Sequence, residues 1–162
     1  MERLLDFTRQ STEETEAAPT DLNAIVREAL EISKPKLARI ELVLQLGTPS
    51  VVLVRPADCV TATVNLLINA ADALNGKGTI TVRTGTTNDG AWIEVADNGP
   101  GMPPEIKSRI LEPFFTTKGD SGTGLGIPMV YAFTERYGGR LEIESEPGYG
   151  ARFRMWFPTH RP

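Results

Sequence analysis

The sequence of 162 residues contains only one cysteine, Cys59, and only one histidine, His160. A single cysteine cannot form an internal disulfide bond, so we expect a reducing compartment. No apolar run approaches the roughly 18 residues that a membrane-spanning helix needs, and no apolar signal-peptide segment stands at the N-terminus. We therefore expect a cytoplasmic protein without direct membrane contact, a location compatible with a membrane-anchored parent protein.

An excess of positive charge is also lacking, because the net charge is −4 at pH 7. Binding to nucleic acid usually needs a basic face that neutralises phosphates, so we expect no nucleic-acid partner. Hydrophobic residues make up 40% of the chain and charged residues 23%, which is typical of a soluble globular protein. A chain of this length is expected to form one domain with its own core.

The first half of the chain contains alternating helix and strand signals. The apolar helical pattern of residues 1–10 is followed by a polar stretch, residues 11–18, which we interpret as a linker. Thr20 or Asp21 is a suitable N-cap for the helix that follows. Ile40, Leu42, Leu44 and Leu46 alternate with other residues, which predicts a half-buried strand. A short strand is predicted over 51–55, and a helix from Pro56 to about Asn75, ended by Gly76-Lys-Gly78.

The second half of the chain is richer in strands. Strands are predicted at 79–86 and 91–97, joined by the hairpin signal Asn88-Asp89-Gly90. Residues 98–121 form a long connection with one short helix at 104–111, and such connections are often functional lids. A helix at 124–137 and a hairpin of 140–145 with 152–157 follow. The sum predicts an α/β two-layer sandwich with a mixed, mostly antiparallel sheet and helices on one face.

Asn65 and Asn69 lie four residues apart on a predicted helix and therefore share one face. They are either two satisfied buried amides or oxygen ligands for Mg²⁺, which prefers oxygen ligands and bridges phosphates. The glycine motifs further along the chain favour the second interpretation.

Asp97 ends a predicted strand and enters the segment Gly99-Pro-Gly101-Met102. An ordinary Asx-turn is one interpretation of Asp-Asn-Gly. A carboxylate buried at a strand end needs a donor, however, and the amino group of adenine is one. Glycines at 99 and 101 allow the backbone to approach a base closely, so we favour adenine recognition.

Gly122-Thr123-Gly124-Leu125-Gly126 precedes a predicted amphipathic helix. Successive backbone N–H groups and a helix N-terminus both favour phosphate, although a lone glycine-rich loop is often only a flexible turn. Because this loop closes a long lid, we expect it to bind an anion.

Read in order, segments 65–72, 97–102, 112–118 and 122–126 resemble the N, G1, F and G2 boxes of the catalytic ATP-binding domain of bacterial sensor histidine kinases (HATPase_c, GHKL superfamily). The resemblance extends over about residues 21–157. It implies a Bergerat fold with an ATP lid. It also implies that residues 1–18 are the end of a helical dimerisation and phosphotransfer domain plus linker, 19–159 the catalytic domain and 160–162 a tail.

The resemblance assigns roles to individual residues. Asn69, with Asn65, would hold Mg²⁺, and Asn65 and Lys118 would serve catalysis. The residues implied in ATP binding are Asn65, Asn69, Asp97, Gly99, Gly101, Met102, Lys118, Gly122, Thr123, Gly124, Leu125 and Gly126. The γ-phosphate would pass to a histidine on the separate helical domain of the parent kinase, and then indirectly to a response-regulator receiver domain. His160 is not expected to be the acceptor, and the isolated domain is expected to be a monomer.

The chain departs from the family pattern at several positions. Thr61 stands where many members carry Glu or Gln as a candidate base, and Asp72 where many carry Lys or Arg, which leaves Lys118 or Lys77 to supply positive charge. Ala73 replaces an aromatic residue, and Ala151 lacks the usual Thr hydroxyl. Two alternatives stay open: an ATP hydrolase or clamp of the same fold, and a degenerate nucleotide-binding module. Asn65 stands where the hydrolases have a Glu base, and the Phe114-Phe115 pair also disfavours a hydrolase.

Overall fold

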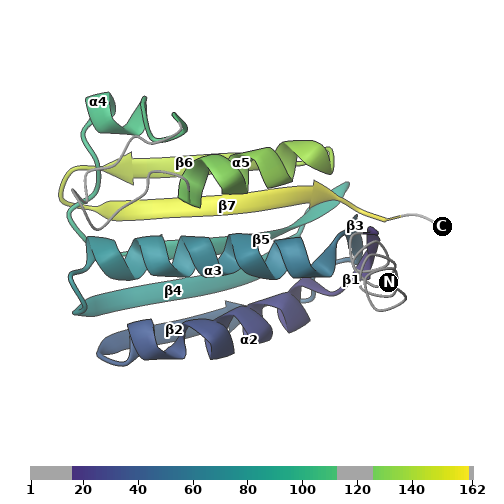
Figure 1. Ribbon diagram of the computed structural model, residues 1–162, viewed down its shortest axis with the longest axis horizontal. Coiled ribbons are helices and arrows are strands. Elements are labelled where there is room, and N and C mark those ends of the chain that lie inside the picture. The colour runs from purple at the N-terminus through teal and green to yellow at the C-terminus, as the bar shows by residue number, and fades with distance from the viewer. Residues whose placement is uncertain (1–15, 113–125, 161–162) are drawn as a thin grey trace, which may run out of the picture.

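The computed structural model describes residues 16–112 and 126–160, which form two layers: a five-stranded sheet and helices on one of its faces (Figure 1). The strand order is β2-β4-β5-β7-β6, and every neighbouring pair is antiparallel except the parallel pair β2 and β4. The strands are β2 (Ile40–Leu46), β4 (Gly78–Thr86), β5 (Gly90–Asp97), β6 (Arg140–Glu146) and β7 (Gly150–Pro158). The predicted fold class is confirmed.

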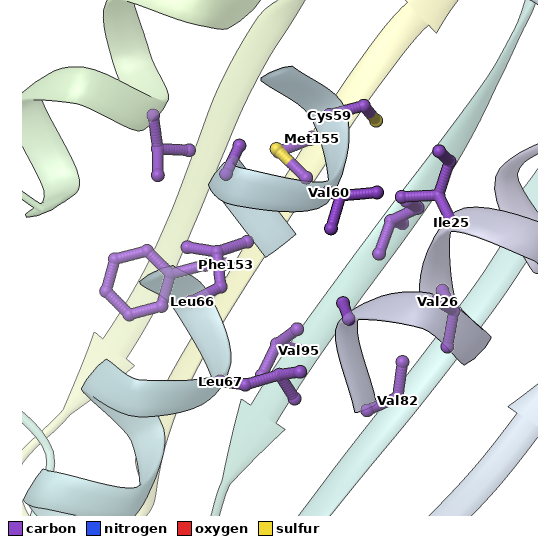
Figure 2. Close-up of a cluster of buried hydrophobic side chains, with 14 of the residues drawn as sticks. Ile25, Val26, Cys59, Val60, Leu66, Leu67, Val82, Val95, Phe153 and Met155 are labelled. Atoms are coloured by element: carbon purple, nitrogen blue, oxygen red, sulfur yellow. The ribbon is translucent and has the colours of Figure 1, made fainter. Parts of the chain in front are cut away.

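The core lies between this sheet and the helices α2 (Leu22–Ser33), α3 (Pro56–Ala73) and α5 (Gly126–Arg136). Figure 2 shows α2 and α3 pointing Val26, Leu66 and Leu67 toward Val95 and Phe153 of the sheet. All five side chains are almost completely buried. Burying one such side chain contributes about 1.5–3 kcal/mol, so the packing of the helices against the central strands contributes strongly to stability.

The ends of α2 and α3 follow from their local sequences. Asp21 caps α2, because its side chain accepts a hydrogen bond from the backbone N–H of Asn23 at 3.0 Å. Pro56 is the first residue of α3, a position where proline is favoured. The helix ends at Ala73, two residues before the predicted end. Asn75 and Gly76 have φ angles of 52° and 82°, in the left-handed region that terminates helices.

Three elements differ from the sequence predictions. An additional strand, β1 (Ala18–Thr20), pairs with β3 (Val52–Val54) in a separate two-stranded sheet. The predicted helix at 104–111 is shorter, because α4 covers only Pro104–Lys107. A 3-10 helix, η1 (Lys34–Leu37), follows α2 directly.

The predicted burial pattern of β2 is wrong for its middle residues. Ile40 is buried, but Leu42 and Leu44 are 37% and 46% exposed. The reason is the position of β2 at the edge of the sheet, where β4 is its only neighbour among the described strands. The alternation of apolar residues identifies the strand correctly but does not reveal that it lies at an edge.

The face of the sheet opposite the helices carries a charged cluster centred on Glu94. Its side chain is completely buried, and the Oε1 atom accepts hydrogen bonds from Arg154 Nε and Nη2 at 3.1 and 2.8 Å. Arg152 Nε lies 3.5 Å from the same oxygen, and Arg83 Nη1 lies 3.6 Å from Oε2. We call Glu94, Arg83, Arg152 and Arg154 the open-face cluster.

Two tryptophans on the same face lie flat over glycines. A Cβ atom on Gly85 would lie 2.4 Å from the Trp92 ring, and one on Gly90 would lie 2.3 Å from the Trp156 ring. Arg154 and Arg140 then stack on the outer sides of these rings, 3.9 and 4.1 Å from the Trp92 and Trp156 centroids. The side chains of the sheet itself thus cover the face on which none of the described helices packs.

None of the helices in the described ranges 16–112 and 126–160 is long and apolar enough to cross a membrane.

Candidate functional site

Helix α3 supplies the two asparagines of the predicted metal site. Asn65 and Asn69 are half-buried on one side of the helix, while Leu66, Leu67 and Ala70 are buried in the core. The sequence therefore produces a helix that is mostly apolar with one polar strip, as its residue pattern predicts.

The amide groups of this strip are available for a ligand. The threonine hydroxyls of α3 are used internally, since Thr61 donates to the carbonyl of Ala57 and Thr63 to that of Cys59. No hydrogen bond joins the side chain of Asn65 or Asn69 to another residue of the described chain. Two half-buried amide oxygens on one helix face fit a hard cation such as Mg²⁺. No group of three or more His, Cys, Asp and Glu side chains gathers elsewhere in the described residues.

Asp97 is the last residue of β5, the central strand, which pairs with β4 on one side and β7 on the other. The residue is 8% exposed, and its Oδ1 atom accepts a hydrogen bond from the backbone N–H of Gly99 at 2.9 Å. Burial raises the pKa of the carboxyl, and the backbone N–H groups of Gly99 and Ala151 partly oppose this rise. The second carboxylate oxygen leaves acceptor capacity for a bound donor.

The loop after Asp97 lies against the C-terminal end of α3. A Cβ atom on Gly99 would be 3.3 Å from the carbonyl oxygen of Ala73. Ala73 lies one turn beyond Asn69, on the same side of the helix. The structure therefore brings the loop of Asp97 next to the helix face that carries the asparagines.

Asp97 also lines an open cleft of about 530 Å³ at this end of the sheet. Lys107 of α4, Ser145 at the end of β6 and Tyr149 of the β6–β7 turn contribute to its walls. Tyr149 is 83% exposed, so its ring faces solvent. In Figure 1, α4 and the β6–β7 turn lie at the same end of the sheet.

The structure shows the contacts of the residues that depart from the family pattern. Thr61 is exposed, and its hydroxyl donates a hydrogen bond to the carbonyl of Ala57. A threonine hydroxyl in this arrangement cannot serve as a general base. The carboxylate of Asp72 lies 4.0 Å from Lys36 Nζ. Ala151 lies directly opposite Asp97 in the β5–β7 pair, so the missing hydroxyl would have been beside the buried carboxyl. Lys77 is exposed in the turn after α3.

Part of the predicted site lies outside the described residues. This part contains Lys118, Gly122, Thr123, Gly124 and Leu125, together with the Phe114-Phe115 pair. Of the glycine-rich segment, Gly126 is described, and it is the first residue of α5. Met102, predicted to contact the base, is half-buried and packs against the core.

One residue at this end of the sheet was missed by sequence reasoning. The backbone N–H of Met102 donates to the hydroxyl of Ser145 at 2.8 Å, so Ser145 supports the loop of Asp97. A serine near the end of a strand gives no sequence signal for such a role, because its partner is 43 residues away.

The chain belongs to the family described as histidine kinase-, DNA gyrase B-, and HSP90-like ATPases (HATPase_c), whose family model matches residues 55–161. The family resemblance predicted from the four motifs is thereby confirmed.

Within this family the chain is similar to sensor histidine kinases. It is 30% identical over 143 residues to the sensor histidine kinase ZraS of Escherichia coli K12, which covers 86% of this chain and 30% of that protein. Its fold matches the nucleotide-free catalytic domain of histidine kinase ThkA with a TM-score of 0.80 and 27% identity, covering 89% of this chain and 96% of that one. The full-length kinase ShkA in complex with AMPPNP matches with a TM-score of 0.77 and 26% identity, over 90% of this chain and 32% of that one.

The chain spans between 20% and 30% of the length of the curated relatives it matches. The similarity therefore concerns the ATPase domain of these sensor kinases.

Proposed function

We propose that this chain binds Mg·ATP and is the catalytic domain of a sensor histidine kinase, giving the γ-phosphate to a histidine on a separate helical domain. The observation that carries the proposal is the buried Asp97 at the end of the central strand, with its loop against the asparagine face of α3. The similarity to ShkA, solved in complex with AMPPNP, supports nucleotide binding by this chain.

The roles of the residues follow from their chemistry. Asp97 accepts a hydrogen bond from the adenine amino group, and Gly99, Gly101 and Met102 form the backbone wall beside the base. The amide oxygens of Asn65 and Asn69 would hold Mg²⁺, which would neutralise phosphate charge. Lys118 and segment 122–126 would contact the phosphates; of these residues, only Gly126 lies in the described part.

Asn65 favours transfer to a protein acceptor over hydrolysis. An amide has no useful basicity, so position 65 cannot activate water as a glutamate would. Among the described residues, the neighbouring Thr61 is no substitute, since its hydroxyl is bonded to Ala57. The chain would therefore hold ATP until a histidine nitrogen attacks the γ-phosphorus and ADP leaves.

The partners follow from this mechanism. Residues 1–18 are proposed as the end of the helical dimerisation and phosphotransfer domain, 19–159 as the catalytic domain and 160–162 as a tail. The helical domain of the parent kinase is the direct partner, and a response-regulator receiver domain is the indirect one. Without the helical domain, a monomer is expected.

The test has two stages. Calorimetric titration with a non-hydrolysable ATP analogue, with and without Mg²⁺, should show magnesium-assisted binding. Incubation with radiolabelled ATP and the separately purified helical domain of the parent kinase should then label that domain on histidine. Binding without transfer would support a degenerate module, and rapid phosphate release without the helical domain would support a hydrolase.

Replacing Asn69 with alanine should reduce the effect of magnesium on nucleotide affinity. We expect affinity in the presence of Mg²⁺ to fall about 10- to 100-fold, the range for lost metal-site interactions, and affinity without metal to change little. Thr61→Ala is the matched control, because Thr61 lies on the same helix two turns earlier and is exposed. Equal losses with and without Mg²⁺ would contradict the assignment of Asn69 as a metal ligand.

The raised pKa of Asp97 gives a prediction about stability and pH. The folded protein binds this proton more tightly than the unfolded chain, where the pKa is near the ordinary value of 3.8. The contribution of Asp97 to the free energy of unfolding is therefore largest below that value and is lost as pH rises through the folded-state pKa. Denaturant unfolding of the wild type and Asp97→Asn between pH 4 and 7 should show the wild type losing stability relative to the variant. A constant difference would contradict the prediction.

A further inference from the structure

The β6–β7 turn holds the loop that follows Asp97 through its backbone. The N–H of Gly148 donates to the carbonyl of Pro100 at 2.7 Å. The N–H of Met102 donates to Ser145 Oγ at 2.8 Å, and Ser145 Oγ donates to the carbonyl of Gly150 at 3.1 Å. One serine hydroxyl thus connects the loop, the end of β6 and the start of β7.

The same two segments are packed without spare room. Gly101 and Gly150 have φ angles of +73° and +83°. A Cβ atom on Gly101 would lie 2.0 Å from the carbonyl oxygen of Glu146, and one on Gly150 would lie 2.0 Å from that of Asp97. Because each backbone occupies the space where a side chain would be, a shift of the turn must shift the loop.

Ser145 and Asp97 are also connected across the sheet. Ser145 pairs with Ala151 in β7, and Ala151 pairs with Asp97 in β5. The three residues form one row at the end of the sheet. The hydroxyl of Ser145 is therefore linked to both ends of the segment 97–102. It accepts a hydrogen bond from Met102 directly, and it is connected to Asp97 through the start of β7.

We propose that Ser145 is a positioning residue for the nucleotide base, which sets the loop 97–102 relative to Asp97 without contacting ATP itself. This inference rests on the proposed function. The β6–β7 hairpin would thus contribute to nucleotide affinity as well as forming part of the sheet. Losing the hydroxyl removes the acceptor of Met102 N–H and the donor to Gly150 while every apolar core contact stays in place.

The experiment compares Ser145→Ala, Ser145→Thr and the control Ser50→Ala. Ser50 is a suitable control because it is half-buried and its hydroxyl also lies within hydrogen-bond distance of two groups, Thr86 and Thr159 Oγ1. These contacts lie at the opposite end of the sheet from Asp97. The readouts are affinity for the ATP analogue, thermal midpoint, and the hydrogen-exchange rate of the Met102 amide without nucleotide.

We expect Ser145→Ala to weaken nucleotide binding about tenfold and to speed exchange of the Met102 amide, with Ser145→Thr restoring both. Ser50→Ala should leave nucleotide affinity and Met102 exchange unchanged, even if it lowers the thermal midpoint as much as Ser145→Ala does. Unchanged affinity in Ser145→Ala, or an equal loss of affinity in Ser50→Ala, would overturn the proposal.

The failure of the proposed function would be distinguishable from the failure of this inference. If the wild type bound no ATP analogue, the proposed function would fail, and the positioning role with it. Met102 exchange in the nucleotide-free protein would still report whether Ser145 holds the loop. If the wild type bound and Ser145→Ala bound equally well, only the inference would fail.

Discussion

Asp97→Asn is expected to weaken binding of an ATP analogue at least about 100-fold while leaving the protein folded. A hydrogen bond to a charged group contributes about 1.5–3 kcal/mol, and about 1.4 kcal/mol corresponds to a tenfold change. In the variant, the new amide NH₂ would also face the adenine amino group. Two hydrogen-bond donors would then face each other, which weakens binding further. Calorimetric titration of the wild type and the variant in the presence of Mg²⁺ measures the effect.

The structure explains why the fold should survive this substitution. An asparagine keeps an oxygen that can accept the Gly99 N–H, which Asp97 Oδ1 accepts now. The substitution also removes a charge from a site that is 8% exposed. Asp89→Asn is the matched control, because Asp89 is exposed in the β4–β5 turn, at the far end of the same strand. Binding of Asp97→Asn within a few-fold of the wild type would contradict adenine recognition by this carboxylate.

Glu94→Gln should cost about 3 kcal/mol of the free energy of unfolding. Removing one partner of a buried ion pair usually costs about 3–5 kcal/mol, because the remaining charge stays buried and unpaired. The three arginines of the open-face cluster are 31–42% exposed in their side chains, so they can turn toward water and the lower end of this range applies. Such a loss should lower the thermal midpoint by roughly 6–12 °C, measured by calorimetry or circular dichroism.

Glu142→Gln is the control for this prediction. Glu142 lies beside Arg154 in the register of β6 and β7, but its side chain is 45% exposed. An exposed ion pair contributes little, so the change should stay within about 0.5 kcal/mol. Similar losses for Glu94→Gln and Glu142→Gln would mean that the buried carboxylate is not the centre of the cluster. Nucleotide affinity should be unaffected in both variants.

The sequence predicts most elements because the signals are local. Asn88-Asp89-Gly90 predicts the β4–β5 hairpin, and Asp21 and Gly76 mark helix ends through their own backbone preferences. Motif spacing likewise predicts that Asn69 and Asp97 belong to one site. In the structure, Gly99 lies beside the C-terminal turn of α3, and the shared site stays a prediction.

What the sequence does not predict depends on contacts between distant segments. Glu94 resembles an ordinary exposed residue of a half-buried strand, since its partners Arg83 and Arg154 come from two different neighbouring strands. The exposure of Leu42 follows from the edge position of β2, which sequence alternation does not report. The support of Met102 by Ser145 depends on the packing of a turn against a loop, which no short motif encodes.

The indole rings on the open face have a consequence for colloidal behaviour. Trp92 and Trp156 provide two flat aromatic surfaces, and the guanidinium groups of Arg154 and Arg140 keep them under a charged, hydrated layer. Replacing Arg140, whose side chain is 54% exposed, would cost little folding free energy. It would, however, expose the Trp156 ring to other molecules. We therefore expect the arginines of this face to limit association between molecules at high protein concentration.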